Sequence, residues 1–331
     1  MALALSGGAT FRQKTTGFER VEFVYNALPE MNFSEITTKQ PFLHTTLACP
    51  FIITGMTGGY PDAEKINGAL AEAANTVGVA LGVGSMRAAL EAPHPDPSYT
   101  VVQRWSSRVP IIANLGAVQV AAWHTSKQLS HYIQRAIDMV GASALAIHLN
   151  PLQELLQPEG EPRFGGVLEA IEHAVAISPV PIIVKEVGAG LSRAVAEKLA
   201  RAGVTMLDVA GAGGTSWAGI EILRRADAES QMHLWDVGIP TAESLQQCLN
   251  IVPCVIASGG ITTGTDAAKA IAMGAMLAGT ARPMLEAYSR GGLEEIVAEL
   301  RKWELQLRQW MFLTGCSTLE LFRTSRTTRT L

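Results

Sequence analysis

The sequence predicts an α/β protein of the (β/α)8, or TIM-barrel, class, with an N-terminal lead-in and a long C-terminal helix. About eight short apolar runs occur along the chain, and nearly every one is followed by a helical segment. Each run is apolar throughout, which is typical of parallel strands buried on both faces. The length of 331 residues suits a barrel of about 250 residues with additions, which remains one domain.

Residues 1–45 are expected to form an irregular segment, and residues 46–331 the barrel with its C-terminal helix. The expected strands are Cys49–Ile53, Val79–Val83, Pro110–Ala113, Ala144–Ile147, Pro181–Val184, Met206–Val209, Val255–Ala257 and Ala275–Gly279. The expected helices are Ala63–Thr76, Leu129–Val140, Gly166–Ile177, Ser192–Ala202, Thr241–Leu249 and Thr265–Met273. Ser192 and Thr241 are predicted to cap the helices that they begin.

An open doubly wound sheet is the alternative architecture, and it requires a Gly-x-Gly-x-x-Gly turn after the first strand. The segment Gly55–Gly59 does not supply that turn. Beyond the barrel, Leu293–Leu313 is a long amphipathic helix that either packs on the barrel or contributes to an oligomer interface. The basic tail Arg323–Arg329 is predicted to be disordered.

The composition argues against several classes of protein. The formal net charge of -4 provides no basic surface for nucleic acid. The four cysteines include no Cys-x-x-Cys pair, which argues against disulfides and structural zinc and suits the reducing cytoplasm. The short apolar run at Met1–Gly8 does not have the form of a signal peptide, and no stretch is long and apolar enough to predict a membrane span.

Polar residues crowd together after the fourth strand. His148, Asn150, Gln153 and Glu154 follow the apolar run Ala144–Ile147 within seven positions. In a strand, His148 and Asn150 would point to the same face. A polar loop with one satisfied histidine would give the same pattern, but in a barrel the residues after each strand converge on one mouth.

Two further loops indicate a phosphate site at that mouth. Ser258-Gly259-Gly260 follows the seventh strand, and Gly279-Thr280-Ala281-Arg282 follows the eighth, which are the recurrent phosphate positions of this fold. Glycines let backbone N–H groups approach phosphate oxygens, although ordinary tight turns would also contain them.

Lys185 stands alone at the end of an apolar strand, and lysine is rarely buried without an anion or a perturbed pKa. It could act as a Schiff-base nucleophile, a general base or a cation facing an anionic cofactor ring. Glu154 could bind Mg²⁺ together with substrate phosphate oxygens and water, and Arg87 would suit a second phosphate group.

Several motifs resemble the type 2 isopentenyl diphosphate isomerases, which are FMN-dependent (β/α)8 enzymes. The likeness extends over nearly the whole chain from about Thr15. Its motifs are Thr16-Gly17-Phe18-Glu19, Asn26-Ala27-Leu28-Pro29-Glu30, Met56-Thr57-Gly58-Gly59, Ala113-Asn114-Leu115-Gly116, His148–Glu154 with Pro158-Glu159-Gly160, Val184–Gly188, Asp208–Trp217 and Ala257–Ile261.

The resemblance implies that FMN lies over the barrel mouth. Its ring and ribityl chain would contact Thr54, Gly55, Met56, Thr57, Ser85, Asn114, Lys185 and Thr215. Its phosphate would be held by Gly259, Gly260, Thr280 and Ala281. Lys185 would then be a cation near the electron-rich edge of the flavin.

The implied reaction is a 1,3-allylic proton shift from isopentenyl to dimethylallyl diphosphate, with reduced FMN, Mg²⁺ and NADPH as reductant. Gln153 and His148 would be catalytic, and Glu154 would bind the metal. The implied substrate contacts are Ser85, Met86, Arg87, His148, Asn150, Gln153 and Trp217. A homo-oligomer, either a tetramer or an octamer, is expected from the same resemblance.

The sequence departs from the family pattern in two places. The Arg-Lys-x-x-His type segment that grips the diphosphate is not found in Met1–Phe11, and Met86 stands where the family usually has glutamine. Two alternatives stay open, and the missing N-terminal segment is the reason for the second of them. The protein could be another FMN barrel oxidoreductase, of the 2-hydroxy-acid oxidase kind, or a flavin-binding relative without catalytic activity.

Overall fold

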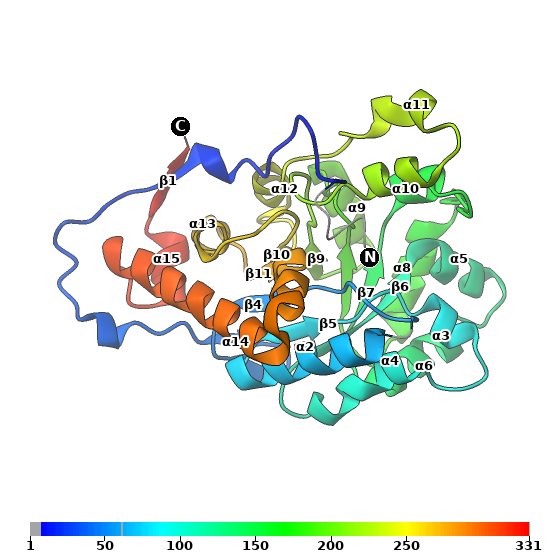
Figure 1. The fold of residues 1–331 in the computed structure, drawn as a ribbon, viewed down its shortest axis with the longest axis horizontal. Coiled ribbons are helices and arrows are strands. Elements are labelled where there is room, and N and C mark those ends of the chain that lie inside the picture. Colours follow the sequence, from blue (N-terminus) through cyan, green and yellow to red (C-terminus); the bar gives the residue numbers. More distant parts are fainter. Residues whose placement is uncertain (1–7, 61, 331) are drawn as a thin grey trace.

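The computed structural model describes residues 8–60 and 62–330, and its centre is a closed barrel of eight parallel strands (Figure 1). The strands follow one another around the barrel in chain order, and β11 pairs with β4 to close it. They are β4 (Phe51–Ile53), β5 (Ala80–Gly82), β6 (Ile111–Gly116), β7 (Ala144–His148), β8 (Ile182–Lys185), β9 (Met206–Asp208), β10 (Cys254–Ala257) and β11 (Leu277–Thr280). The fold prediction and all eight predicted strands are confirmed.

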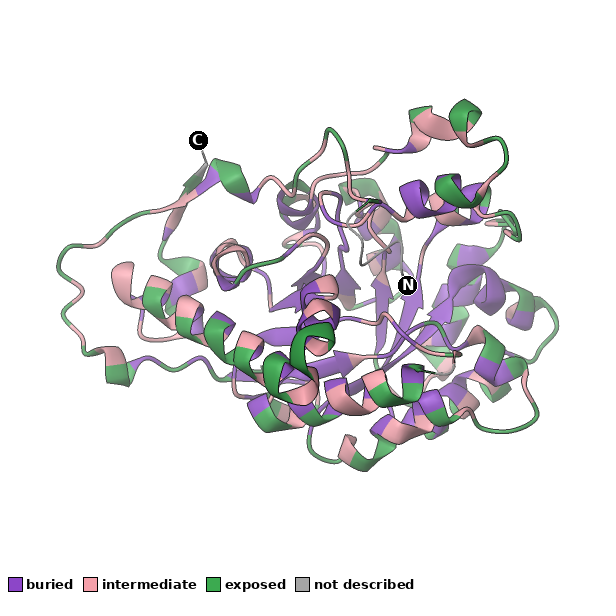
Figure 2. Cartoon of the chain, viewed as in Figure 1, coloured by how far each residue is buried: buried purple, intermediate pink, exposed green. Residues whose placement is uncertain are grey.

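Helices surround the barrel and turn their exposed sides outward, while the strands are buried (Figure 2). The helices are α2 (Ala63–Val77), α3 (Arg87–Glu91), α4 (Pro97–Thr100), α5 (Ala117–Thr125), α6 (Leu129–Val140), α7 (Pro151–Leu156), α8 (Val167–Ile177), α9 (Arg193–Arg201), α10 (Trp217–Arg224), α11 (Ala228–Gln231), α12 (Thr241–Cys248), α13 (Gly264–Ala272), α14 (Arg282–Leu313) and α15 (Leu319–Thr324). Short 3-10 turns are η1 (Phe18–Arg20), η2 (Phe33–Glu35), η3 (Val101–Trp105) and η4 (Met232–Leu234). All six predicted helices are present. None of the described helices is both long and apolar enough to cross a membrane.

A small hairpin covers the amino-terminal end of the barrel, so the lead-in is less irregular than the sequence predicts. It consists of β2 (Gln40–Phe42) and β3 (Thr45–Leu47). Phe42 and Leu47 join the apolar cluster that fills the barrel interior. Burying such a side chain contributes about 1.5–3 kcal/mol, so the hairpin helps to close the core.

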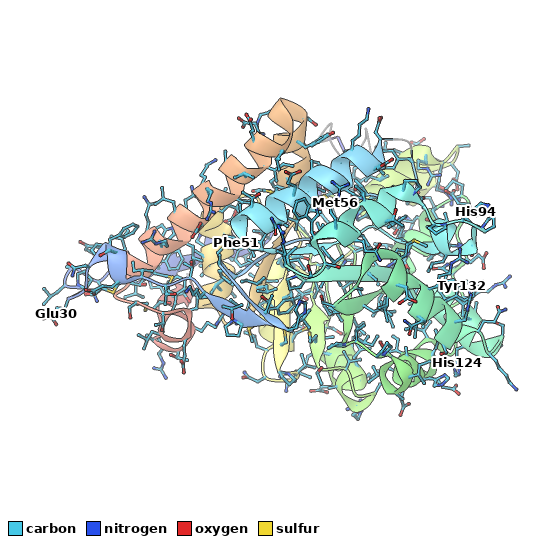
Figure 3. All side chains as sticks on the ribbon, turned by 90° about the horizontal axis from the view of Figure 1, so that it is seen from below. Glu30, Phe51, Met56, His94, His124 and Tyr132 are labelled. Atoms are coloured by element: carbon cyan, nitrogen blue, oxygen red, sulfur yellow. The ribbon has the colours of Figure 1, made fainter. Side chains whose placement is uncertain are left out.

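The C-terminal helix packs on the barrel, which supports one of the two roles that the sequence left open. The predicted segment Leu293–Leu313 is the part of α14 that follows a break at Gly291 and Gly292. Trp303 is fully buried and meets Phe51 of β4 edge-on, with ring centroids 6.1 Å apart. Figure 3 labels Phe51 beside this helix.

The prediction of a disordered basic tail is wrong. Residues Thr328–Thr330 form β12, which pairs antiparallel with β1 (Val21–Phe23). Arg323 reaches back from α15 and donates hydrogen bonds to the carbonyls of Ala275 and Met276 and to the Gln40 side chain, at 2.6 to 3.0 Å. A basic composition indicated solvation, but long-range acceptors hold this tail in place.

One of the two predicted caps is confirmed. Ser192 is the N-cap of α9 and accepts a hydrogen bond from the backbone of Val195. Thr241 does not cap α12, because Pro240 occupies that position. The Thr241 hydroxyl instead donates to the Gly259 carbonyl at 2.6 Å, and thereby supports the loop after β10.

We expect Arg323→Ala to lower the free energy of unfolding by about 2–4 kcal/mol, because it leaves buried acceptors unpaired. Urea denaturation would measure this loss. Arg201→Ala removes an exposed arginine from α9 and should change stability by less than about 0.5 kcal/mol. Equal effects of the two substitutions would contradict a clamping role for Arg323.

Candidate functional site

The carboxyl ends of three neighbouring strands bring one imidazole, one ammonium and one carboxylate together. The pairing register places His148 of β7 beside Lys185 of β8, and Lys185 beside Asp208 of β9. His148 and Asp208 are buried, and Lys185 is partly buried. The sequence predicted the first two of these residues at the mouth, but it assigned no role to Asp208.

His148 is held as a neutral imidazole. The Asn114 amide nitrogen donates to the Val83 carbonyl at 3.1 Å, which leaves the Asn114 oxygen to accept from Nδ1 of His148 at 2.9 Å. This assigns the proton to Nδ1 and a lone pair to Nε2. Burial, reinforced by the positive charge of Lys185, lowers the pKa of His148 to about 3. At neutral pH the ring is therefore uncharged, and its Nε2 can accept a hydrogen bond.

Lys185 faces a small chamber of about 20 Å³ at the top of the barrel interior. Among the described residues it forms no ion pair, and its ammonium donates to the Glu186 carbonyl. The residues lining the chamber include the predicted cofactor contacts Thr54, Gly55, Asn114 and Lys185 together with Asp208. A partly buried ammonium without a salt bridge is chemically suited to an anionic ring above it.

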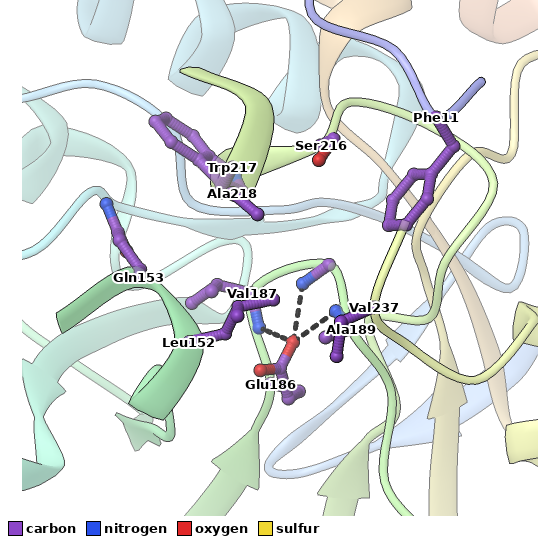
Figure 4. A pocket seen from close by; sticks show the side chains of 11 residues that line it. Phe11, Leu152, Gln153, Glu186, Val187, Ala189, Ser216, Trp217, Ala218 and Val237 are labelled. Carbon is purple, nitrogen blue, oxygen red and sulfur yellow. Dashed lines mark hydrogen bonds between the residues drawn. The ribbon is translucent and has the colours of Figure 1, made fainter. Parts of the chain in front are cut away.

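Two buried carboxylates flank this lysine. Burial raises the pKa of Asp208, and the charge of Lys185 is the largest effect opposing that rise. Burial also raises the pKa of Glu186, whose carboxylate accepts backbone hydrogen bonds from Val187, Gly188 and Ala189 (Figure 4). Backbone N–H groups are thus the main stabilising partners of the Glu186 carboxylate. Glu186 lies in a second pocket.

That second pocket contains Gln153, the predicted catalytic glutamine. It is a narrow space of about 10 Å³ in which Gln153, Trp217 and Phe11 line the upper side (Figure 4). The Gln153 amide nitrogen donates to Glu221 at 3.1 Å, and its oxygen accepts from Asn150 at 3.4 Å. These two bonds fix which end of the amide is the donor.

Glu154 lies beside this pocket at the start of α7. Its carboxylate accepts from the Asn150 amide at 3.0 Å and from the Glu161 backbone at 2.8 Å. The Asn150 oxygen is buried without a partner. Among the described residues no three His, Cys, Asp or Glu side chains form a metal-binding group. One carboxylate and one free amide oxygen fit a Mg²⁺ ion that takes its other ligands from phosphate and water.

Strand β7 ends before Asn150, which affects the prediction that His148 and Asn150 share a strand face. β7 stops at His148, and Asn150 is the N-cap of α7 with φ -143° and ψ 46°. The argument that His148 and Asn150 share a strand face therefore does not apply. Both side chains are nevertheless buried near the same strand end.

The glycine loop after β10 has the features of a phosphate cradle. Gly259 and Gly260 have φ values of +100° and +67°, a backbone conformation that favours glycine. Within the described chain, their N–H groups form no hydrogen bond. Thr280, the last residue of β11, donates a hydrogen bond from its hydroxyl to the Ile261 carbonyl of this loop at 3.2 Å. Free donors at a strand end fit an anionic phosphate.

The loops after β4 and β5 are supported from α2 and α4. Thr57 is buried and its hydroxyl bonds to Asn67, while the Tyr99 hydroxyl donates to the Ser85 carbonyl. Ser85 is exposed at the mouth, and Arg87 is half-exposed, 3.3 Å from Glu91 and 3.8 Å from Glu161. Met56, Thr215 and Ala281 are partly buried near the ends of β4, β9 and β11.

Met86 is a correction to the predicted substrate contacts. Its side chain is fully buried in the main hydrophobic core, so it offers no surface to a ligand. Its backbone N–H donates to the Asn114 carbonyl at 2.9 Å. The residue at this position therefore supports the site from behind.

Sequence reasoning gave no role to Phe11, Glu186 and Asp208, which line these two cavities, or to Glu221, which accepts a hydrogen bond from Gln153. An acidic residue closing the apolar run Met206–Asp208 was a usable signal for the third of them. Glu221 lies four residues after Trp217, one helical turn along α10. Nothing in the sequence indicated that Phe11, from the lead-in, would reach the mouth.

A parallel barrel with free backbone donors after β10, an ammonium without a salt bridge and apolar walls has the features expected of a flavin-binding barrel. The chain matches the family described as FMN-dependent dehydrogenase over residues 2–329. A mandelate oxidase structure, bound to 3,3-difluoro-2-hydroxy-3-phenylpropionic acid, superimposes with a TM-score of 0.66 over 99% of this chain and 94% of that one. At 18% identity, this similarity shows the shared fold.

Similar curated proteins identify the group within this class to which the chain belongs. An isopentenyl-diphosphate delta-isomerase of Methanococcoides burtonii is 42% identical over 320 residues, covering 95% of this chain and 86% of that protein. One of Pseudescherichia vulneris is 45% identical over 313 residues, covering 93% and 88%. The chain therefore belongs to the isopentenyl-diphosphate delta-isomerases within the FMN-dependent dehydrogenase family.

The lowered pKa of His148 predicts a loss of stability in acid. Between about pH 6.5 and 3 the unfolded chain binds a proton that the folded imidazole does not, so a falling pH favours unfolding. We expect this residue to contribute a slope of about 1.4 kcal/mol per pH unit, which His148→Gln should remove. Urea titrations of both proteins at several pH values would measure the difference. Exposed His94, changed to glutamine, should leave the slope as it is.

Proposed function

We propose that this protein converts isopentenyl diphosphate to dimethylallyl diphosphate by a 1,3-allylic proton shift, using reduced FMN and Mg²⁺. The observation that carries the proposal is the oriented Gln153 amide in an apolar pocket next to the Lys185 chamber. The proposal includes NADPH as the reductant and a homo-oligomer of four or eight chains in the cytoplasm.

The cofactor side of the site would be formed by the strand ends around Lys185. Thr54, Gly55, Met56, Thr57, Ser85, Asn114 and Thr215 would contact the ring and ribityl chain, and Gly259, Gly260, Thr280 and Ala281 the phosphate. The free N–H groups of Gly259 and Gly260 support this assignment. Lys185 would place its charge against the flavin edge and favour an anionic ring.

The substrate side would be formed by α7, α3 and α10. Glu154 and the unpaired Asn150 oxygen would bind Mg²⁺, which would supply positive charge for the diphosphate. Arg87 would give a second positive charge to the diphosphate. Trp217 and the apolar lining of the pocket would exclude water from the five-carbon chain.

Neither of the two residues proposed to be catalytic is a strong acid or base for the allylic carbons. His148 is neutral, and Gln153 does not titrate. The four cysteines are buried, and burial raises the pKa of Cys248 to about 11, so no thiolate is available. Reduced FMN, when bound, would supply the proton donor and acceptor and would stabilise developing positive charge. Gln153 and His148 would hold and orient the substrate by hydrogen bonds.

A 2-hydroxy-acid oxidase activity is the alternative. That chemistry needs a histidine base and an arginine for the substrate carboxylate. The loop after β10, from Ser258 to Thr263, contains neither residue. The structure therefore offers no specific support for this second activity.

The direct test is to incubate the purified protein with FMN, Mg²⁺ and isopentenyl diphosphate under anaerobic reducing conditions, and to measure dimethylallyl diphosphate. We expect turnover with dithionite or NADPH and none with oxidised FMN. A protein that retains FMN but gives no product would favour a non-catalytic flavin-binding relative. Bleaching of the flavin by lactate or glycolate would favour an oxidase.

We expect Glu154→Gln to raise the Mg²⁺ concentration needed for half-maximal activity by about 10–100-fold, because an anionic metal ligand is lost. Initial rates over a Mg²⁺ series would measure this shift. Glu169→Gln changes a carboxylate on α8 that is 77% exposed, and should have no such effect. An unchanged Mg²⁺ dependence in Glu154→Gln would exclude it as the ligand.

A further inference from the structure

We propose that Asp208 is the counter-charge of Lys185, and that it sets how strongly the site prefers reduced over oxidised flavin. The inference rests on the proposed FMN site but concerns a residue to which neither the sequence motifs nor the family resemblance gave a role. Its basis is the juxtaposition of the two side chains at the ends of adjacent strands.

The geometry brings the two charges into one enclosed space. Lys185 of β8 and Asp208 of β9 are register partners, and both line the chamber of about 20 Å³ at the barrel mouth. The floor of this chamber is apolar and consists of Ile52, Ile112, Ala146, Ile183 and Ile256. Charges facing so small and apolar a space interact more strongly than they do in water.

The Asp208 carboxylate is rigidly held. One of its oxygens, Oδ1, accepts a hydrogen bond from the Ser258 hydroxyl at 2.6 Å and another from the Ala210 backbone at 3.2 Å. Ala210 has a φ of +37°, a left-handed conformation that is costly for a residue with a Cβ. Two donors on one oxygen favour the ionised carboxylate, and a strained backbone maintains one of them.

The other titratable groups near Lys185 do not compete for this role. His148, on the other side in β7, is neutral. Glu186 is adjacent in sequence, but its carboxylate is occupied by three backbone N–H groups in the neighbouring pocket. Asp208 is therefore the carboxylate that shares a chamber with the ammonium.

This pairing has a consequence for the cofactor. A lysine alone would favour the negatively charged reduced ring strongly. A carboxylate that shares the chamber with that lysine removes part of the favourable potential. Removing the carboxylate should therefore shift the preference toward reduced FMN, and removing the lysine should shift it the other way.

The test is the isosteric substitution Asp208→Asn in the FMN-loaded protein. We expect the ratio of the Kd for oxidised FMN to the Kd for reduced FMN to rise about tenfold or more, since one unit of negative charge is lost from a poorly solvated site. A potentiometric titration of the bound flavin reports the same change as a higher midpoint potential. An unchanged potential would overturn the proposal, because it would mean that Asp208 carries no charge that the flavin feels.

A matched variant separates charge from hydrogen bonding. Ser258→Ala removes the 2.6 Å hydrogen bond to Asp208 and keeps the carboxylate, so the Kd ratio should change by less than about threefold. Lys185→Gln should lower the ratio, and the double variant with Asp208→Asn should return to within about threefold of the parent. If Asp208→Asn and Lys185→Gln shifted the Kd ratio in the same direction, the cause would be general damage to the site, and the proposal would be contradicted.

A second measurement needs no cofactor and no turnover. In FMN-free protein we expect the urea midpoint of the double variant to lie no lower than that of the less stable single variant, because a paired charge is removed together with its partner. Additive losses would contradict the pairing. If the two residues are coupled but the protein has no isomerase activity, the proposed function fails and this inference still holds.

Discussion

The closing contact between β11 and β4 is the constraint on which the rest of the molecule depends. It places Thr280 beside Ile53 and makes a ring from strands that all run the same way. Because the ring is closed and parallel, every strand delivers its last residue to one mouth. Apolar side chains fill the interior below, and the β2–β3 hairpin covers the opposite end. Polar chemistry is therefore confined to a single end of the barrel.

Because the polar groups are confined to one end of the barrel, several titratable side chains are buried close together there. Four titratable groups, His148, Lys185, Glu186 and Asp208, lie within two positions of the ends of three adjacent strands. Burying four independent charges would cost far more than a domain has to spare. The imidazole stays neutral, backbone N–H groups surround one carboxylate, and Ser258 with Ala210 supports the other. The ammonium remains as the positive charge at the chamber, which Asp208 also lines.

The sequence predicted the barrel and much of the site for the same physical reason. Continuous apolar runs mark strands buried on both faces, and parallel strands bring the residues after those runs together. Lys185, Asn114 and His148 could be assigned on that basis. Contacts between segments distant in sequence could not be predicted in this way. Arg323 finds its acceptors across the fold, Phe11 reaches the mouth from the lead-in, and Met86 turns into the core, and none of these follows from local pattern.

The two halves of the site are held by separate side-chain networks, which bears on how substitutions should combine. On the substrate side, Gln153 bonds to Glu221, which pairs with Arg224 at 2.6 Å. On the cofactor side, Asp208 bonds to Ser258. Within the described chain, no side-chain hydrogen bond joins these networks, and they meet through the backbone bond from Leu149 to Lys185. Groups that share no partner combine nearly additively. The diphosphate end, including any contribution from residues 1–7, which lie outside the described residues, can therefore vary while the barrel mouth keeps its cofactor chemistry.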